Sequence, residues 1–276
     1  MSDAVALAPH RPTLLPEQAA APSPRLERPI TLHFMGDWGQ FNLTRVCGWL
    51  AQEVGDRSPP GTRSAIWTGR GGTDTVRAVA RGEVQVGVAT PAQFVQLALD
   101  GRGPYGGEAF PRLRALGTVL QTDRLVLAVR ADLGIRTFAD LRDRRVPLRI
   151  ATCPDDGVNH IGFALQRIME AAGIPRATLE AWGGAYLEDE RPFPCLQWVA
   201  DGRADAVFQE AIMTPDCQTL AATTDLAFIP LEDAVLAEVG RRLGWQRATL
   251  PAGYMRGLDA PLAVLDFSDF LGRVQE

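Results

Sequence analysis

The sequence predicts an α/β fold with mostly parallel sheets, and three observations carry this prediction. Short strand-like stretches alternate with amphipathic helical stretches along most of the chain. Glycines and prolines separate the two kinds of segment. A helix–strand unit also recurs, because VARGE at 79–83 and VADGR at 199–203 each lead into a short apolar strand followed by a Thr-Pro pair. Two lobes of similar build would produce this repeat, and so would two unrelated helix–strand units.

In the first half of the chain, alternating apolar residues predict strands at 30–35, 64–68, 84–88, 113–120 and 124–130. A helix is expected from the turn at 36–39 to about Val54, ahead of the breaker at 59–61. Thr73 is expected to N-cap a helix that runs to Arg81 and is closed by Gly82. Pro91 is expected at the first position of the next helix.

In the second half, apolar side chains recur at helical spacing at Ile161, Ala164, Leu165, Ile168, Met169 and Ala172. This pattern predicts an amphipathic helix that Gly173 and Pro175 end. Strands are expected at 148–153, 179–182, 206–209 and 226–230, with helices between them. The alternation therefore continues to the C-terminal region.

The composition excludes several mechanisms. All 28 basic residues are arginine, so no lysine can form a Schiff base, reach a nucleotide phosphate from a P-loop or act as a general base. The net charge of −5 argues against a nucleic-acid binder. The four cysteines form no C-x-x-C pair, which argues against a zinc ribbon or a redox motif, and they are interpreted as buried apolar residues.

Residues 1–28 are rich in proline and alanine and predict a disordered arm. They show no basic segment followed by an apolar run of secretory length, and no stretch of about 20 apolar residues occurs in the sequence. The expected location is therefore the cytoplasm for the sequence as written, or outside the cytoplasmic membrane if translation starts elsewhere.

Three loops, at 36–40, 69–74 and 154–159, follow strands and precede helices. Ligands of open α/β sheets gather at such strand ends, where helix N-termini offer free N–H groups to carboxylates or phosphates. Each loop taken alone can equally be an ordinary tight turn with a Thr or Asp helix cap and no ligand. Because Asp37, Asp74 and Glu210 are expected near the same cleft, a zwitterion suits it better than a pure anion.

Catalytic motifs are absent from the sequence: there is no G-x-S-x-G and no H-E-x-x-H. Cys153 and His160 could face each other as a thiol–base pair across a turn, and Asp155 lies between them, but Asp155 and Asp156 are interpreted mainly as helix caps. No catalytic residue, metal ligand or cofactor is therefore assigned.

Several stretches resemble the TAXI-type solute-binding receptors, which work with TRAP transporters. They include ITLHFMGDWGQF at 30–41, GGTDTVRAVARGEVQVGVATP at 71–91 and VADGRADAVFQEAIMTP at 199–215, and the resemblance runs from about 30 to about 255. It implies the two-lobed type II periplasmic-binding-protein fold, with a hinge at 124–130 and 227–231. The first lobe would hold 29–123 and 228–276, and the second lobe 124–227.

Carried over by position, the resemblance implies ligand-binding residues in both lobes: Gly36, Asp37, Trp38, Gln40, Phe41, Gly72, Thr73, Asp74, Thr90 and Pro91 from the first, and Gly157, Val158, Asn159 and Gln209 from the second. It implies a monomer that binds a small carboxylate or amino acid between the lobes and has TRAP membrane subunits as partners. The sequence departs from that family in two ways. Such receptors are normally exported, whereas this sequence shows no export signal, and they usually continue beyond the point where this sequence stops. An alternative is therefore a cytoplasmic decarboxylase or dehydratase of a small organic acid on the same scaffold.

Overall fold

The first lobe is built on a three-stranded parallel sheet. The computed structural model describes residues 24–37, 42–117, 124–209 and 214–266. In this lobe β1 (Thr31–Asp37) lies between β2 (Arg63–Gly69) and β3 (Val86–Val88). Helix α1 (Asn42–Asp56) packs on the sheet so closely that a Cβ at Gly36 would lie 3.0 Å from the Leu43 backbone. The predicted strands at 30–35, 64–68 and 84–88 are thereby confirmed, with small shifts at their ends.

The rest of the first lobe is helical. It consists of α2 (Thr73–Ala80), α3 (Gln93–Asp100) and the 3-10 turn η1 (Gly103–Tyr105). Gly101 ends α3 in the left-handed conformation, with φ of 69°. Because Val76, Phe94, Leu97 and Tyr105 are buried, this side of the lobe carries most of its apolar core.

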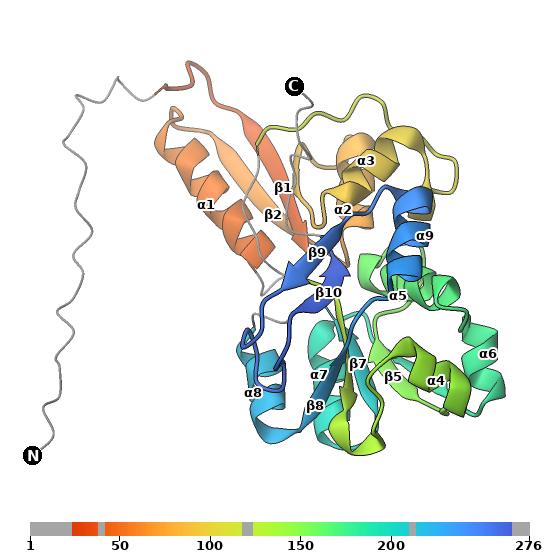
Figure 1. Ribbon diagram of the computed structural model, residues 1–276. Coiled ribbons are helices and arrows are strands. Elements are labelled where there is room, and N and C mark those ends of the chain that lie inside the picture. Colours follow the sequence, from red (N-terminus) through yellow and green to blue (C-terminus); the bar gives the residue numbers. More distant parts are fainter. Residues whose placement is uncertain (1–23, 38–41, 118–123, 210–213, 267–276) are drawn as a thin grey trace, which may run out of the picture.

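The second lobe is built on a five-stranded mixed sheet in the order β6-β5-β7-β4-β8. Its strands are β4 (Val126–Arg130), β5 (Arg149–Thr152), β6 (Ala185–Glu188), β7 (Ala206–Gln209) and β8 (Leu226–Ile229). Strands β5, β6 and β7 run parallel, whereas β4 is antiparallel to both β7 and β8. The chain therefore enters this sheet on β4 and leaves it on the neighbouring strand β8 (Figure 1).

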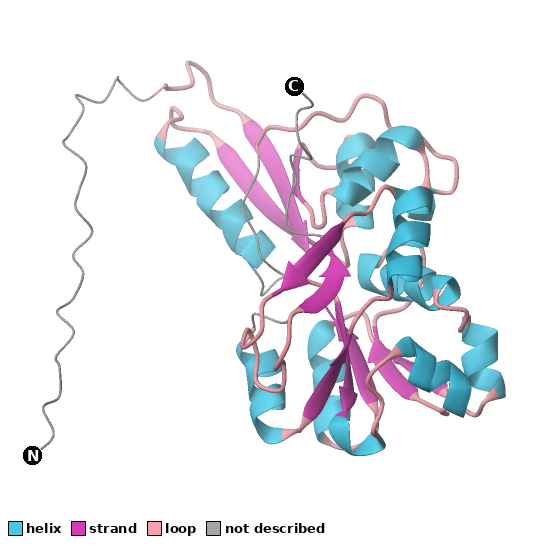
Figure 2. Ribbon diagram, viewed as in Figure 1, coloured by secondary structure: helices cyan, strands magenta, loops and turns pink. Residues whose placement is uncertain are grey.

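Helices cover both faces of the second sheet (Figure 2). The helices of this lobe are η2 (Ala131–Leu133), α4 (Phe138–Arg144), α5 (His160–Ala171), α6 (Arg176–Ala181), α7 (Pro192–Ala200) and α8 (Pro215–Thr223). Side chains alternate along β4: Leu127 and Val129 join the apolar cluster that contains α4 and α5. Val126 and Ala128 join the cluster that contains α7 and α8. This alternation is what a strand buried on both faces requires.

After β8 the chain forms α9 (Asp233–Leu243) and the antiparallel pair β9 (Arg247–Leu250) and β10 (Leu262–Leu265). This segment touches both lobes. Leu250, Leu262 and Val264 pack in the cluster of α7 and α8, while the Arg242 carbonyl accepts a hydrogen bond from Arg102 of the first lobe at 3.5 Å. The two-lobed α/β fold that the sequence predicts is therefore confirmed.

An aromatic cluster joins the lobes beside this segment. Phe94 on α3 stacks on Trp245 with ring centroids 5.7 Å apart. It also meets Phe163 and His160 of α5 edge-on, each at 5.7 Å. The apolar core thus runs continuously from one lobe into the other.

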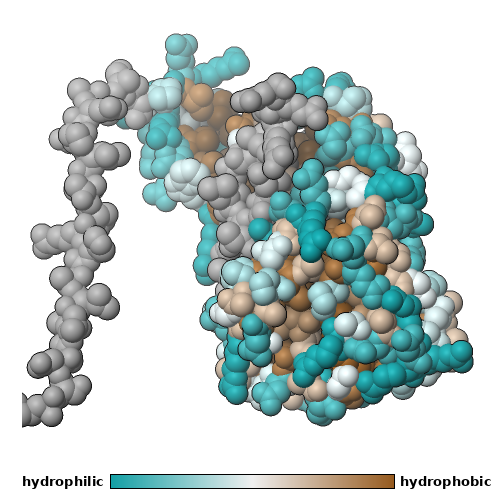
Figure 3. Space-filling view, in the orientation of Figure 1, coloured by the Kyte–Doolittle hydropathy of each residue, from teal (hydrophilic) through white to brown (hydrophobic). Residues whose placement is uncertain are grey.

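The surface carries apolar side chains where the first sheet is thinly covered. Ile66 and Trp67 on the edge strand β2 are 42% and 52% exposed. Hydrophobic atoms also show among the hydrophilic ones over the first lobe and over the second (Figure 3). Within the described residues, none of the helices combines the length and the apolarity that spanning a bilayer demands.

The structure corrects several predicted elements. Residues 179–182 do not form a strand, because RATLEA at 176–181 is α6 and the strand follows at 185–188. Good helix formers after Pro175, with only Leu179 buried, favour a short surface helix there. The stretch 113–117 pairs with no described strand, and 118–120 lies outside the described residues, as do 1–23 of the predicted N-terminal arm.

Two predicted helix starts also differ. Thr73 is the first residue of α2 rather than its cap, and Gly72 holds the cap position without a side-chain hydrogen bond. The Thr73 hydroxyl instead donates to the Gly157 carbonyl of the second lobe. Helix α3 begins at Gln93, after a turn in which the Phe94 N–H donates to the Pro91 carbonyl at 3.1 Å.

Candidate functional site

Nearly all buried polar side chains of the described residues gather at the junction of the two lobes. They lie at the carboxyl ends of β1, β3, β5 and β7 or in the first turns of α2 and α5. Eight of the nine are here: Asp37, Thr73, Thr75, Thr90, Thr152, Asn159, His160 and Gln209. Burying polar groups is unfavourable unless they are hydrogen-bonded, so this concentration singles out the junction as the candidate site.

The loop before α2 contacts the start of α5 directly. Gly72 and Asn159 form an antiparallel bridge. The His160 N–H donates to the Gly71 carbonyl at 3.1 Å, and the ring Nδ1 of His160 lies 3.0 Å from the same oxygen. The Asn159 amide donates to the Arg70 carbonyl at 3.2 Å.

A second set of contacts runs from α2 to the loop before α5. The Thr73 hydroxyl donates to the Gly157 carbonyl at 3.1 Å and also contacts the Val158 carbonyl. The Arg77 guanidinium donates to the Gly157 carbonyl at 2.6 Å and to the Pro104 carbonyl at 2.6 Å. The two predicted binding loops are therefore hydrogen-bonded to each other across the junction.

Glycine is required where the loops meet. Gly72 has φ of 83°, and a Cβ there would lie 2.5 Å from the Thr90 carbonyl oxygen. A Cβ at Gly71 would lie 2.9 Å from the Cα of Asn159. Only a residue without a side chain allows this approach of one backbone to the other.

Asp37, at the end of β1, is the acid of the junction whose pKa is shifted most. Its side chain is 0% exposed, and Oδ1 accepts a hydrogen bond from the Thr75 hydroxyl at 2.8 Å. Oδ2 has no hydrogen-bond partner among the described residues. Burial, and then repulsion from Asp74, raise the pKa of Asp37 from 3.8 to about 7, against the opposing influence of the Gly72 N–H, Thr75 and His160.

Asp74 and Asp156 complete the turns of the two loops. Asp74 accepts from the Arg70 N–H at 2.8 Å and from the Thr75 N–H at 2.9 Å. Asp156 accepts from the N–H groups of Val158 and Asn159, both at 2.9 Å. These carboxylates therefore neutralise the backbone donors on which an anion could otherwise bind.

The thiol–base hypothesis for Cys153 and His160 is not supported by the geometry. The Gln209 amide donates to the buried Cys153 Sγ at 3.6 Å, whereas the His160 ring is directed to the Gly71 carbonyl. Asp155 pairs with Arg167 at 3.1 Å. Burial raises the pKa of the Cys153 thiol, which is the opposite of what a nucleophile needs.

The predicted site residues fall into three groups. The junction holds Asp37, Gly72, Thr73, Asp74, Thr90, Gly157, Val158, Asn159 and, through Cys153, Gln209. Gly36 faces α1, and Pro91 lies in the turn before α3. Trp38, Gln40, Phe41 and Glu210 lie outside the described residues.

The predicted ligand-binding residues do not include Thr75 and Thr152, and the sequence offers Arg77 only as one of three arginines, with Arg70 and Arg124, that could lie near the cleft. Thr75 bonds to Asp37 and Arg77 reaches across to the other lobe. The Thr152 hydroxyl is buried without a partner in the described part of the chain. A polar residue three or five positions after Gly72 was the available signal, but its surroundings were not readable from the sequence.

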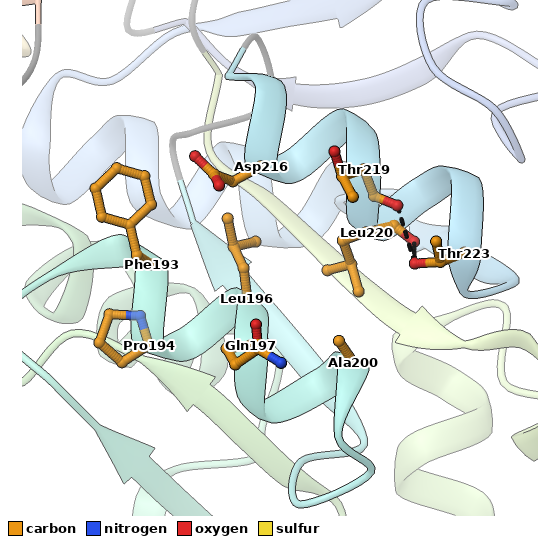
Figure 4. Close-up of a pocket in the computed structure, with 9 residues that line it drawn as sticks. All are labelled: Phe193, Pro194, Leu196, Gln197, Ala200, Asp216, Thr219, Leu220 and Thr223. Atoms are coloured by element: carbon orange, nitrogen blue, oxygen red, sulfur yellow. Dashed lines mark hydrogen bonds between the residues drawn. The ribbon is translucent and has the colours of Figure 1, made fainter.

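No three His, Cys, Asp or Glu side chains within the described ranges converge as metal ligands would. A shallow groove of about 310 Å³ lies between α7 and α8 and is lined by Phe193, Leu196, Asp216 and Leu220 among others (Figure 4). It contains none of the junction residues.

Known proteins resemble this chain in sequence and in structure. The chain is similar to the alkanesulfonate-binding protein SsuA from Xanthomonas axonopodis pv. citri, with 17% identity over 73% of this chain and 61% of that one and a TM-score of 0.42. It is similar to the periplasmic aliphatic sulphonate binding protein SsuA from Escherichia coli, with 15% identity over 72% of this chain and 56% of that one and a TM-score of 0.45. A substrate binding protein of an amino acid ABC transporter has 14% identity over 86% of this chain and 85% of that one, with a TM-score of 0.43.

The chain thus spans 61% and 56% of the lengths of the two SsuA proteins. A family model described as NMT1-like family matches residues 56–267. This match takes in the first lobe from β2 onward, the whole second lobe and the segment after it. The chain belongs to the NMT1-like family.

Proposed function

We propose that this protein binds a small carboxylate or amino-acid solute between its two lobes, as a TAXI-type receptor that delivers the solute to TRAP membrane subunits. One observation carries the proposal: eight buried polar side chains meet at the junction of two lobes. The TAXI assignment itself is supported by the sequence stretches that resemble that family.

Solute entry would require the lobes to separate at the loop contacts. Separation would release the Thr73 hydroxyl, the Arg77 guanidinium and the Asn159 amide as donors. It would also release the carbonyls of Gly71 and Gly157 as acceptors. A polar solute can replace these lost hydrogen bonds, so the bound and the closed empty forms can differ little in free energy.

No observation favours the alternative of a decarboxylase or dehydratase. The side chains that would supply its chemistry, Cys153, Asp155 and His160, are each engaged with a different partner.

A thermal-shift screen of amino acids and small mono- and dicarboxylates tests the proposal. A solute present at 100 times its Kd stabilises the folded protein by about 2.7 kcal/mol. Circular dichroism should first show that the sample is folded. If the folded protein then gives no shift with any member of the panel, solute binding of this class is wrong.

The transport role has its own test. A receptor of this type works outside the cytoplasmic membrane and contacts membrane subunits. We therefore expect the protein in the extracytoplasmic fraction of its native cells and cross-linked to a TRAP membrane subunit. A protein that stays in the cytosolic fraction contradicts this part of the proposal.

A further inference from the structure

Three groups from distant parts of the chain, on β1, on α5 and in the turn after β3, converge on one side of Gly72. Measured from the position that a Cβ would take there, the Thr90 carbonyl oxygen lies at 2.5 Å, the His160 Nδ1 at 3.3 Å and the Asp37 Oδ2 at 3.7 Å. Oδ2 belongs to a carboxyl that is 0% exposed, yet it has no hydrogen-bond partner in the described part of the chain. A buried acceptor without a donor is costly, which indicates that the junction is completed by something else.

The charged groups near Asp37 indicate which kind of donor would complement its Oδ2 atom. Arg70 is paired with Glu190 at 3.0 Å, and Arg77 donates to two backbone carbonyls, so neither guanidinium is bonded to Asp37. Asp74 adds negative charge to the same place. Carboxylate and carbonyl oxygens only accept hydrogen bonds, so the complementary group is a cation rich in N–H donors.

We propose that the ligand of this junction carries an ammonium group that docks on Asp37 Oδ2, with the Thr90 carbonyl on the same side as a second acceptor. The inference rests on the proposed function and narrows it: amino acids bind, and the same carboxylates without the amino group do not bind comparably. Gly72 is the residue that makes the approach possible, because any side chain there would fill the space between these groups.

The titration of Asp37 supports this assignment. With a pKa raised to about 7, the carboxyl of the ligand-free protein holds a proton under mildly acidic conditions. The titratable groups near it are Asp74 on α2, His160 on α5, Cys47 on α1 and Tyr105 on η1. An ammonium group would favour the ionised carboxyl and displace that proton.

Isothermal titration calorimetry with matched ligand pairs tests the proposal. The pairs are L-alanine and propionate, L-glutamate and glutarate, and L-valine and isovalerate. We expect one amino acid to bind at least about 30-fold more tightly than its partner without the amino group, as for a buried charge pair. Asp37→Asn should abolish this preference, whereas Asp143→Asn on the exposed face of α4 should keep it.

The outcomes separate this inference from the proposed function. If plain carboxylates bind as tightly as the amino acids, or if Asp37→Asn retains the preference, the ammonium site is wrong while solute binding stands. If no member of either series binds to the folded wild-type protein, solute binding of this class fails and takes the ammonium site with it.

A measurement on the wild-type protein covers the case in which Asp37→Asn does not fold. At about pH 6 the binding of an amino acid should release close to one proton, and at about pH 9 almost none. The release is measured as the dependence of the binding enthalpy on the ionisation enthalpy of the buffer, for example in cacodylate and imidazole. Binding at the lower pH without proton release contradicts the proposal.

Discussion

Gly71 and His160 are joined twice across the lobe junction. The His160 N–H donates to the Gly71 carbonyl at 3.1 Å, and the ring Nδ1 lies 3.0 Å from the same oxygen. One carbonyl of the first lobe therefore holds both the backbone N–H and the ring of His160, the first residue of α5. The junction behaves as one unit, so changes on either side should affect both lobes.

Replacing Gly72 tests how tightly the lobes meet. Gly72→Ala should lower the free energy of unfolding by at least about 2 kcal/mol, because a side chain is strained at positive φ and also collides with the Thr90 carbonyl. Gly82→Ala is the matched control, since Gly82 has φ of 76° but nothing within 4 Å of its Cβ position. It should lose only about 1 kcal/mol in urea unfolding. Equal losses in the free energy of unfolding for the two variants would contradict the prediction, because they would show that the contact with the Thr90 carbonyl adds no cost.

The buried carboxyl of Asp37 should leave a signature in the pH dependence of stability. Its pKa is 3.8 when unfolded and about 7 when folded, so between these values the folded protein binds the extra proton. Its contribution therefore makes the free energy of unfolding fall as pH rises, by at most about 1.4 kcal/mol per pH unit, and become constant above the folded pKa.

Asp37→Asn should remove that slope in denaturant unfolding curves measured across this pH range. Asp140→Asn is an informative comparison, because hydrogen bonds from the Arg136 N–H and from Thr137 lower the pKa of Asp140. Because its pKa is lowered, Asp140 stabilises the folded protein above the pKa that it has when unfolded. Asp140→Asn should therefore lose stability at high pH, whereas Asp37→Asn removes a contribution that is present at low pH. A wild-type slope that persists in Asp37→Asn would contradict the raised pKa.

The Thr73 hydroxyl should hold the junction closed. Thr73→Val keeps the shape of the side chain but removes one of the two donors to the Gly157 carbonyl, which still accepts from Arg77, at a loss of about 0.5–1.5 kcal/mol. Hydrogen exchange of the His160 amide should become faster, because that N–H is protected only while Gly71 stays in contact. Thr73→Ser retains the hydroxyl and should exchange nearly as slowly as the wild type.

Phe94 should be the most sensitive apolar residue between the lobes. It is 1% exposed and meets His160, Phe163 and Trp245. Phe94→Ala should lower the free energy of unfolding by about 3–5 kcal/mol through the cavity that it leaves. Trp49→Ala on α1 removes a larger ring that is 59% exposed and should change stability by less than about 0.5 kcal/mol. Chemical unfolding of both variants compares the two sites.

Local patterns were enough to predict β1, α1, β2 and α5. The apolar spacing from Ile161 to Ala172 fixes the buried face of α5, and Asn159 caps it through the Ile161 N–H at 3.0 Å. The prediction failed at 179–182, because a short segment with one buried residue, Leu179, has no distinct period.

The sequence by itself determined the alternation of strands and helices and the turns near which Asp37, Gly72 and Asn159 lie. These features depend on neighbours a few residues apart, such as side-chain period, caps and glycine turns. Only the tertiary structure decided that Thr73 bonds to the second lobe instead of capping its own helix, and that Asp37 keeps an oxygen without a partner. Burial and hydrogen-bond partners are set by residues far apart in the chain, so no local pattern records them.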